Sequence, residues 1–313
     1  MNQATIREFK KKYNLLVILG ATASGKTTLA VRLATLIGGE IISADSRQVY
    51  RGMDLGTGKD LSAYSEAGVN VPYHLIDIID PSEEFSVFTF QQKFLQCHRM
   101  ITAAGNVPVM VGGTGLYIDS VVRGYHMPEV PENKSLRAEL DSEAMPSLLR
   151  RYLALCPHAH NTTDLKDRQR LVRAIEIADY AANHACEKEP FKNISPFVIG
   201  LCCEREVLRN KITTRLRSRL DQGMVEEVRR LHENGTSWER IDAFGLEYRY
   251  LGLYLRGEIG YEEMFDTLNT RIHQFAKRQE TWFRRMEKHG VVIHWMERVD
   301  EHLALTLIGN AAA

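Results

Sequence analysis

The sequence has no long hydrophobic run and few cysteines. Ahead of Leu15 there is no apolar stretch, and the run from Leu15 to Leu19 is five residues long, far below the roughly 20 that a membrane helix needs. We therefore expect neither a signal peptide nor a spanning segment, and no membrane partner. The five cysteines are odd in number, scattered and without C-x-x-C spacing, which argues against a disulfide framework or a zinc site and fits a reducing cytoplasm.

The chain also has no net charge, because 40 Lys and Arg residues balance 40 Asp and Glu residues over 313 positions. A zero total says nothing about partners by itself, since it can hide a basic face. Residues 205–219 are locally basic, with six Lys or Arg residues against Glu206 alone. A hydrophobic content of 44% without repeats or low-complexity segments indicates a globular protein and excludes disorder and fibrous structure.

Short apolar runs alternate with helical periodicity through residues 14–122, which is typical of βα units that build a parallel sheet. Ser86 is expected to cap an amphipathic helix that ends near Gly105. Strand character resumes after residue 194 and completes the sheet. The predicted strands are Leu15–Leu19, Glu40–Ser43, His74–Ile78, Val107–Val111, Phe197–Leu201 and Val291–Trp295.

The pattern between about Arg123 and Asn193 is helical, with no obvious strand. Its longest element is predicted from about Asp164 to Asn183, with one apolar stripe formed by Leu171, Ala174, Ile175, Ala178 and Ala182. We therefore predict a core made of residues 14–122 and 194–300, an all-helical insertion domain at 123–193, and terminal tails at 1–13 and 301–313.

A phosphate-binding loop follows the first predicted strand and precedes a helix. The residues that fit G-x-x-x-x-G-K-[ST] are Gly20, Ala21, Thr22, Ala23, Ser24, Gly25, Lys26 and Thr27. Such a loop turns backbone N–H groups toward an anion, Lys26 adds a charge, and Thr27 can hold Mg²⁺. The predicted fold is thus α/β, with a P-loop core whose parallel sheet is flanked by helices. ATP, GTP and a diphosphate ester would all satisfy the loop.

Two further residues are expected at the same edge of the sheet. Asp45 ends the second strand, where open parallel sheets bind ligands, so it is a candidate general base. Spacing alone predicts equally well that the Asp45 side chain caps the next turn. Thr114 follows the fourth strand within Gly112–Gly115 and would present its hydroxyl to the same cleft.

These motifs, in this order, resemble the tRNA dimethylallyltransferases over nearly the whole chain. The resemblance is carried by Gly20–Thr27, Asp45–Ser46, Val49–Asp54 with Gly56–Thr57, His74–Asp77, Gly112–Tyr117, Asp167–Ala174, Phe275–Gln279 and Thr281–Arg284. It implies that a dimethylallyl group is transferred from dimethylallyl diphosphate to N6 of the adenosine immediately 3′ of the anticodon, with Mg²⁺. It also implies that the enzyme is bacterial in type, because the zinc-finger extension of eukaryotic relatives is lacking; we expect a monomer.

By this resemblance Asp45 is the base, Thr114 positions Asp45 or the amine, and Arg215 clamps the diphosphate. Basic faces on the insertion and on the C-terminal helix are expected to hold the tRNA anticodon stem-loop. The implied tRNA contacts are Asp45, Ser46, Arg47, Gln48, Thr114, Arg137, Gln169, Arg170, Leu171, Val172, Arg173, Lys277, Arg278, Gln279 and Arg284. The C-terminal helix is expected to bury Phe265, Leu268, Ile272, Phe275 and Trp282.

Arg219, Glu247 and His273 depart from the family pattern. In the family an apolar residue is common at position 219, a basic residue is often found at position 247, and an Arg is often found at position 273. Three alternatives remain open: a P-loop small-molecule kinase, a nucleotide-dependent switch that binds RNA, and a prenyltransferase acting on free adenine nucleotide. The kinase would explain the first 120 residues but not the basic faces.

Overall fold

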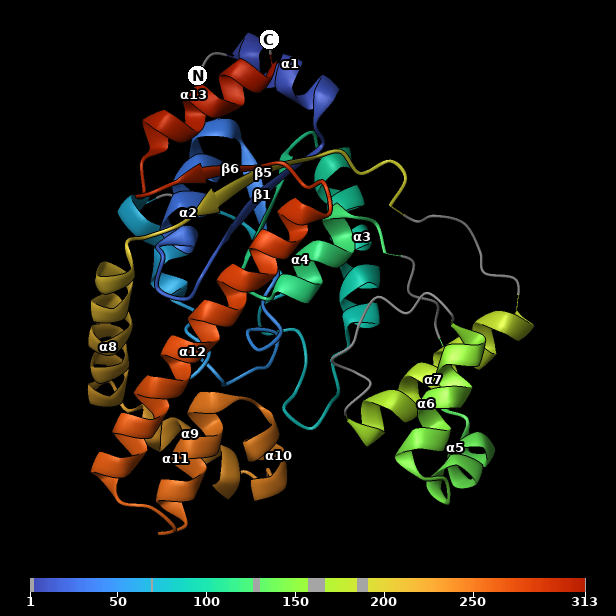
Figure 1. Cartoon of the computed structure of the whole chain (residues 1–313). Helices are drawn as coiled ribbons and strands as arrows, with labels where there is room; N and C mark the ends of the chain where they lie inside the picture. Colours follow the sequence, from blue (N-terminus) through green and yellow to red (C-terminus); the bar gives the residue numbers. More distant parts are fainter. Residues whose placement is uncertain (1–2, 69, 126–129, 157–166, 185–190, 313) are drawn as a thin grey trace. The chain divides into compact units, whose positions relative to one another are not determined.

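The computed structural model describes residues 3–68, 70–125, 130–156, 167–184 and 191–312 (Figure 1). The chain separates into two compact units, residues 1–125 with 191–313 and residues 126–190. Within the described ranges, no helix has the length and apolar character to cross a bilayer.

A six-stranded parallel sheet forms the centre of the first unit, in the order β3-β2-β4-β1-β5-β6. Its strands are β1 (Leu15–Gly20), β2 (Gly39–Ser43), β3 (Tyr73–His74), β4 (Val107–Gly112), β5 (Pro196–Leu201) and β6 (Ile293–Met296). Five of the six predicted strands match to within two residues at either end. The α/β prediction is therefore confirmed.

The predicted strand His74–Ile78 is wrong beyond its first residue. Leu75 and Asp77 adopt positive φ angles of 63° and 54°, which an extended strand does not permit. The backbone N–H of Ile78 instead donates to Val49 O at 2.8 Å. This segment therefore pairs with the loop that follows β2, and β3 is only two residues long.

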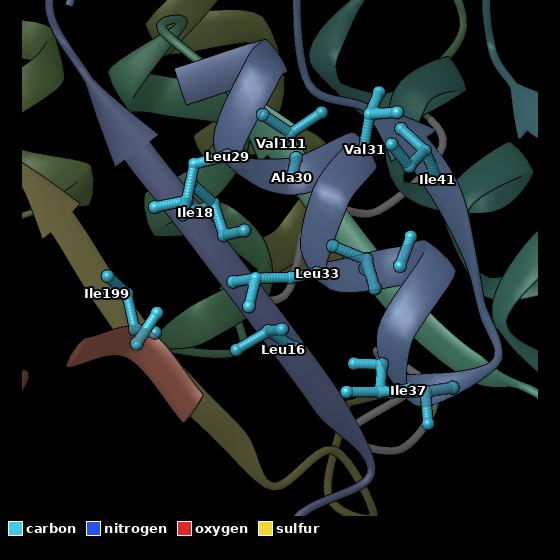
Figure 2. Packing of buried hydrophobic residues seen from close by; sticks show 14 of the residues in the cluster. Leu16, Ile18, Leu29, Ala30, Val31, Leu33, Ile37, Ile41, Val111 and Ile199 are labelled. Atoms are coloured by element: carbon cyan, nitrogen blue, oxygen red, sulfur yellow. The ribbon is translucent and has the colours of Figure 1, made fainter. Parts of the chain in front are cut away.

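Helices cover both faces of the sheet, which explains why the strands read as unbroken apolar runs. Leu16 and Ile18 of β1 pack against α2 (Lys26–Ile37), as Figure 2 shows, while Leu15, Val17 and Leu19 point to the opposite face. The opposite face is covered by α3 (Val87–Ala103) and α4 (Gly115–Val122), with part of α12 (Tyr261–Lys288).

The predicted cap of α3 is confirmed, because the Ser86 side chain accepts a hydrogen bond from Thr89 N. A second helical layer packs around α12, which has 28 residues. It contains α8 (Arg205–Asp221), α9 (Met224–Glu233), α10 (Trp238–Ala243) and α11 (Leu246–Leu255). A 3-10 helix, η1 (Leu61–Gly68), follows the β2 loop. These helices bring residues from the second half of the chain to the carboxyl edge of the sheet.

The two chain ends are helices rather than the predicted tails. Residues 1–13 contain α1 (Gln3–Lys12) and residues 301–313 contain α13 (Glu301–Ala312), and the two lie side by side (Figure 1). Phe9 and Ile308 are buried in the same hydrophobic core as β1. Both segments were predicted as tails, so neither helix was recognised from the sequence.

In the second unit, residues 126–190, the described residues form three helices, α5 (Lys134–Asp141), α6 (Met145–Leu155) and α7 (Arg168–Asn183). The predicted helix start at Asp164 lies outside the described residues; α7 begins after the N-cap Asp167. Ala182 is exposed and does not belong to the stripe. The small core of this unit consists of Leu136, Leu140, Leu148, Leu171 and Ile175.

Candidate active site

The phosphate loop joins β1 to the N-terminus of α2. Gly25 caps the helix in the left-handed conformation, with a φ of 92°, and Ala23 is also left-handed at 61°. The N–H groups of the first helical turn have no intrahelical partner and carry the positive end of the helix dipole. Lys26 Nζ donates to Ala21 O at 3.2 Å, so the ammonium lies over the loop. This geometry suits an anionic phosphate.

Gln279 of α12 fixes the phosphate loop from the side. Its Oε1 accepts from Thr22 N at 2.8 Å, and its Nε2 donates to Gly113 O at 2.8 Å. The amide therefore ties the loop after β1 to the loop after β4. The side chain is mostly buried, although it also lines the cavity described below, and its predicted contact with tRNA stays a prediction.

Asp45 lies just beyond the end of β2, as predicted. Its Oδ1 accepts from Arg47 N at 2.9 Å and more weakly from Gln48 N at 3.4 Å. The turn-capping interpretation is thus correct for Oδ1. Among the described residues Oδ2 has no hydrogen-bond partner, so it stays available to a ligand.

Thr114 supports this loop through the next residue. Its Oγ1 accepts from Ser46 N at 3.1 Å, so it holds the backbone beside Asp45 rather than the carboxylate itself. Gly112 permits this approach, since a Cβ there would lie 2.2 Å from Ala44 O. The loops after β2 and β4 are therefore closely packed.

One cavity of about 240 Å³ unites the predicted catalytic groups. Predicted residues that line it are Thr22, Lys26, Thr27, Asp45, Ser46, Arg47, Gln48, Thr114, Arg215 and Gln279. Arg215, from the middle of α8, donates to Gly58 O at 3.4 Å and forms an ion pair with Asp60. Residues separated by up to 257 positions thus meet at the site that a P-loop α/β fold reserves for ligands.

Charges inside the cavity perturb one another. Burial, followed by repulsion from Arg215, lowers the pKa of Lys26 to about 8. Burial and Arg215 also lower the pKa of Arg219 to about 10. Burial raises the pKa of Glu247. A dianionic ligand would relieve the repulsion among Lys26, Arg215 and Arg219.

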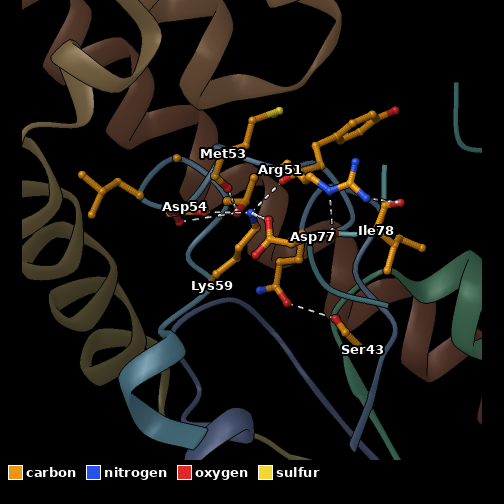
Figure 3. A network of polar contacts seen from close by, with 12 residues as sticks. Ser43, Arg51, Met53, Asp54, Lys59, Asp77 and Ile78 are labelled. Carbon is orange, nitrogen blue, oxygen red and sulfur yellow. Dashed lines mark hydrogen bonds and ion pairs between the residues drawn. The ribbon is translucent and has the colours of Figure 1, made fainter. Parts of the chain in front are cut away.

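The wall of the cavity at Gly56–Gly58 is held by a buried ammonium. Lys59 Nζ donates to Tyr50 O at 2.6 Å and to Asp54 Oδ1 at 2.8 Å, and it also pairs with Asp77 (Figure 3). A buried charge is stable only when it is paired and hydrogen-bonded in this way. The side chain of Lys59 therefore shapes the loop rather than reaching the ligand.

Glu227 of α9 holds the same wall from behind. Its carboxylate accepts from the backbone nitrogens of Asp54, Leu55 and Gly56 and from Tyr248 Oη at 2.7 Å. Sequence reasoning missed Glu227 and Tyr248, since neither belongs to a motif with a recognised spacing. It also placed Phe275 in the core, whereas this ring is 38% exposed and lines the cavity.

The predicted tRNA contacts fall into two groups. Lys277, Arg278 and Arg284 are exposed on α12, and Gln169 and Arg170 are exposed on α7. Leu171 is buried and Val172 packs against the same core, so their side chains stabilise the second unit, and their predicted contact with tRNA stays a prediction.

Arg137 and Arg173 are engaged within the second unit. Both pair with the buried carboxylate of Glu176, and Arg173 also donates to Val130 O at 2.9 Å. Their structural role was not visible in the sequence, because Glu176 was not recognised as a buried acid.

A metal would find few protein ligands here. The described part of the chain has no cluster of three or more His, Cys, Asp or Glu side chains suited to a metal. Thr27 and Asp45 line the same cavity. The described cysteines, Cys97, Cys156, Cys202 and Cys203, are free, while Cys186 lies outside the described residues.

Comparisons with known proteins show the family to which this chain belongs. A family model described as IPP transferase matches residues 48–286, and one described as isopentenyl transferase matches residues 13–68. A tRNA dimethylallyltransferase 2 of Trichlorobacter lovleyi is 56% identical over 291 residues, 93% of this chain and 94% of the relative. A tRNA dimethylallyltransferase 1 of Syntrophus aciditrophicus is 52% identical over 299 residues, 95% and 98% of the two chains. The crystal structure of a tRNA isopentenylpyrophosphate transferase from Bacillus halodurans matches with a TM-score of 0.68 at 33% identity, covering 96% of this chain and 95% of that chain.

Proposed function

Because this chain belongs to the IPP transferase family and is a tRNA dimethylallyltransferase, we propose how its residues carry out the transfer. The dimethylallyl group passes from dimethylallyl diphosphate to N6 of the adenosine immediately 3′ of the anticodon. The observation that carries this assignment of roles is that the phosphate loop, Asp45 and Arg215 line one cavity.

The phosphate loop receives the diphosphate of the donor. The N–H groups of Ala23–Thr27 and the ammonium of Lys26 face the anion, and Arg215 approaches from α8. When the bond between dimethylallyl C1 and the diphosphate oxygen breaks, the electron pair stays on that oxygen. Cations already fixed around the leaving group stabilise this charge without having to reorganise.

Asp45 accepts the proton that the amine must lose. As the N6 lone pair forms the bond to C1, the nitrogen becomes cationic and its proton passes to Asp45 Oδ2. Oδ1 keeps its bonds to the Arg47 and Gln48 backbone, so the carboxylate stays in place during the step. Thr114 holds Ser46 N and thereby the same turn.

Thr27 is the residue that would hold Mg²⁺ next to the diphosphate. This ion commonly uses one or two protein ligands together with substrate phosphate oxygens and water, which agrees with a cavity that has a Thr hydroxyl and few carboxylates. When bound, Mg²⁺ supplies positive charge to the leaving diphosphate.

Exposed cations are proposed to hold the tRNA by its phosphates. On α12 these are Lys277, Arg278 and Arg284, and on α7 the exposed polar residues are Gln169 and Arg170. Ser46, Arg47 and Gln48 line the cavity and are proposed to contact the extruded adenosine. An anticodon-loop base is single-stranded, so its extrusion costs at most a few kcal/mol.

We further propose that the enzyme acts as a monomer in the cytoplasm. A single chain brings together the phosphate loop, Asp45 and Arg215, the groups assigned to the transfer.

The direct test is incubation with Mg²⁺, labelled dimethylallyl diphosphate and unmodified tRNA that carries adenosine after the anticodon, with AMP as a parallel acceptor. We expect label on tRNA at that adenosine alone. Label on AMP alone would instead indicate nucleotide prenylation, and ATP consumption without label transfer would indicate a kinase or a switch.

A further inference from the structure

Arg219 lines the cavity beside Lys26 and Arg215, the two cations already assigned to the diphosphate. Arg219 follows Arg215 by one turn of α8, so both side chains lie on the same face of the helix. Both line the cavity together with Lys26, and each lowers the pKa of Lys26 through its charge. The three cations therefore share one small volume.

The loop after β2 is shaped around the guanidinium of Arg219. A Cβ at Gly58 would lie 1.7 Å from Arg219 Nη2 and 2.9 Å from Arg215 Nη2. Gly58 also has a φ of 67°, in the left-handed region that favours glycine. Because Gly58 lacks a Cβ and adopts a left-handed backbone, the guanidinium groups of Arg215 and Arg219 can reach the cavity at once.

Arg219 has no local partner that would account for its position. Over the described ranges, Arg219 makes no hydrogen bond from its side chain and no ion pair within 4 Å, whereas Arg215 contacts Gly58 O and Asp60. The pKa of Arg219 is lowered to about 10 by burial and by Arg215, while Glu247 and Asp60 oppose the shift. The half-buried group therefore stays charged at neutral pH, with N–H donors that no described protein group uses and that a ligand in the cavity can take.

Packing of α8 does not require Arg219 either. The helix buries one apolar stripe, formed by Leu208, Ile212, Leu216 and Leu220. Arg219 lies outside this stripe and points into the cavity. Its removal would leave the hydrophobic contacts of the helix in place.

We propose that Arg219 is a second guanidinium contact to the diphosphate of dimethylallyl diphosphate, adding N–H donors to those of Arg215 and the phosphate loop. The inference rests on the proposed function, because it takes the diphosphate ester as the ligand of the cavity. The planar fork of Arg matches two phosphate oxygens, which a Lys ammonium does not. The charges of Glu247 and Asp60 favour the charged form of Arg219 and so oppose the lowering of its pKa.

Binding of inorganic diphosphate, with Mg²⁺, to the full-length protein tests this without tRNA and without transfer. We expect Arg219→Met to weaken binding about 10-fold to 100-fold by titration calorimetry, and Arg219→Lys to lie between Met and the native protein. Arg217→Met is the matched control, since Arg217 is exposed on the same helix and packs on Phe265. It should bind as the native protein does.

Kinetics provide a second readout. Arg219→Met should raise the KM for dimethylallyl diphosphate and leave the KM for tRNA unchanged. Native affinity of both Arg219 variants for diphosphate would overturn the assignment, and if the Met variant fails to fold, native affinity of the Lys variant alone would do so. Because the titration requires no acceptor, the two proposals can fail separately. If Arg219→Met loses diphosphate binding but the native protein does not label tRNA, the proposed function is refuted while the assignment of Arg219 to diphosphate binding is supported.

Discussion

Gln279 Oε1 lies 2.8 Å from the backbone nitrogen of Thr22, although the two residues are 257 positions apart. A single amide of α12 thus holds the phosphate loop, while its other end holds Gly113 O. A helix from the C-terminal part of the chain therefore sets the shape of the first functional loop.

Replacing Gln279 by Leu should loosen the phosphate loop. Two backbone groups would lose their partner, at a cost of about 1–3 kcal/mol, so we expect the KM for dimethylallyl diphosphate to rise about tenfold or more. Gln274→Leu, at an exposed position of the same helix, is the control. Steady-state kinetics of both variants measure this, and equal KM values would show that the bridge is dispensable.

Donor binding should weaken as pH rises above about 8. The pKa of Lys26 is lowered to about 8, first by burial and then by Arg215, so the ammonium loses its charge at a lower pH than an ordinary lysine. The ester phosphate is already fully ionised there, so its own charge does not change. Calorimetry between pH 7 and 9.5 should show falling affinity, and Lys26→Arg should not show this fall. A flat profile for the native protein would contradict the role of Lys26.

Arg278 should contribute to tRNA affinity through its charge. It is exposed on α12, so Arg278→Ala should weaken binding for all tRNA substrates alike. We expect the slope of log affinity against log salt to fall by about 1. Filter binding at several salt concentrations measures the slope, and an unchanged slope would remove Arg278 from the interface.

We predict that the carboxylate of Glu176 stabilises the folded state. Its carboxylate is buried and accepts from Arg137, Arg173 and Asn133 N. Burial alone would raise its pKa, but these bonds lower it below the ordinary value. The carboxylate therefore stabilises the fold above that ordinary pKa and stops doing so as pH falls through the lowered one.

We expect Glu176→Ala to cost about 2 kcal/mol of unfolding free energy at neutral pH, because the half-exposed arginines can still bind water. Glu139→Ala, which removes an exposed partner of Arg151, should change stability by less than about 1 kcal/mol. Thermal unfolding followed by circular dichroism compares the two. Similar melting temperatures for Glu176→Ala and Glu139→Ala would show that the contacts of Glu176 do not stabilise the fold.

The sequence was sufficient for the features that depend on local pattern. Five of the six strands, the phosphate loop and the Ser86 cap follow from hydrophobic period and from residues at fixed spacing. Asp45 and Thr114 were placed correctly because the carboxyl ends of parallel strands lie along one edge.

Features that depend on distant contacts could not be predicted. The exposed face of a helix does not reveal that Arg173 pairs with a buried Glu176, nor that Gln279 turns inward. The end helices were missed because α1 has few apolar residues among its charges. For Asp45 the turn-capping interpretation is confirmed at Oδ1, while its role as the base stays a proposal.

The exchange of Asp45 for Asn tests the central claim most directly. Asn keeps an Oδ1 that accepts from Arg47 N, so the turn should persist, but it cannot accept a proton. Under single-turnover conditions with tRNA and donor saturating, we expect transfer to slow by about 10²-fold to 10⁴-fold while both ligands still bind. Transfer at the native rate would show that Asp45 is not the base.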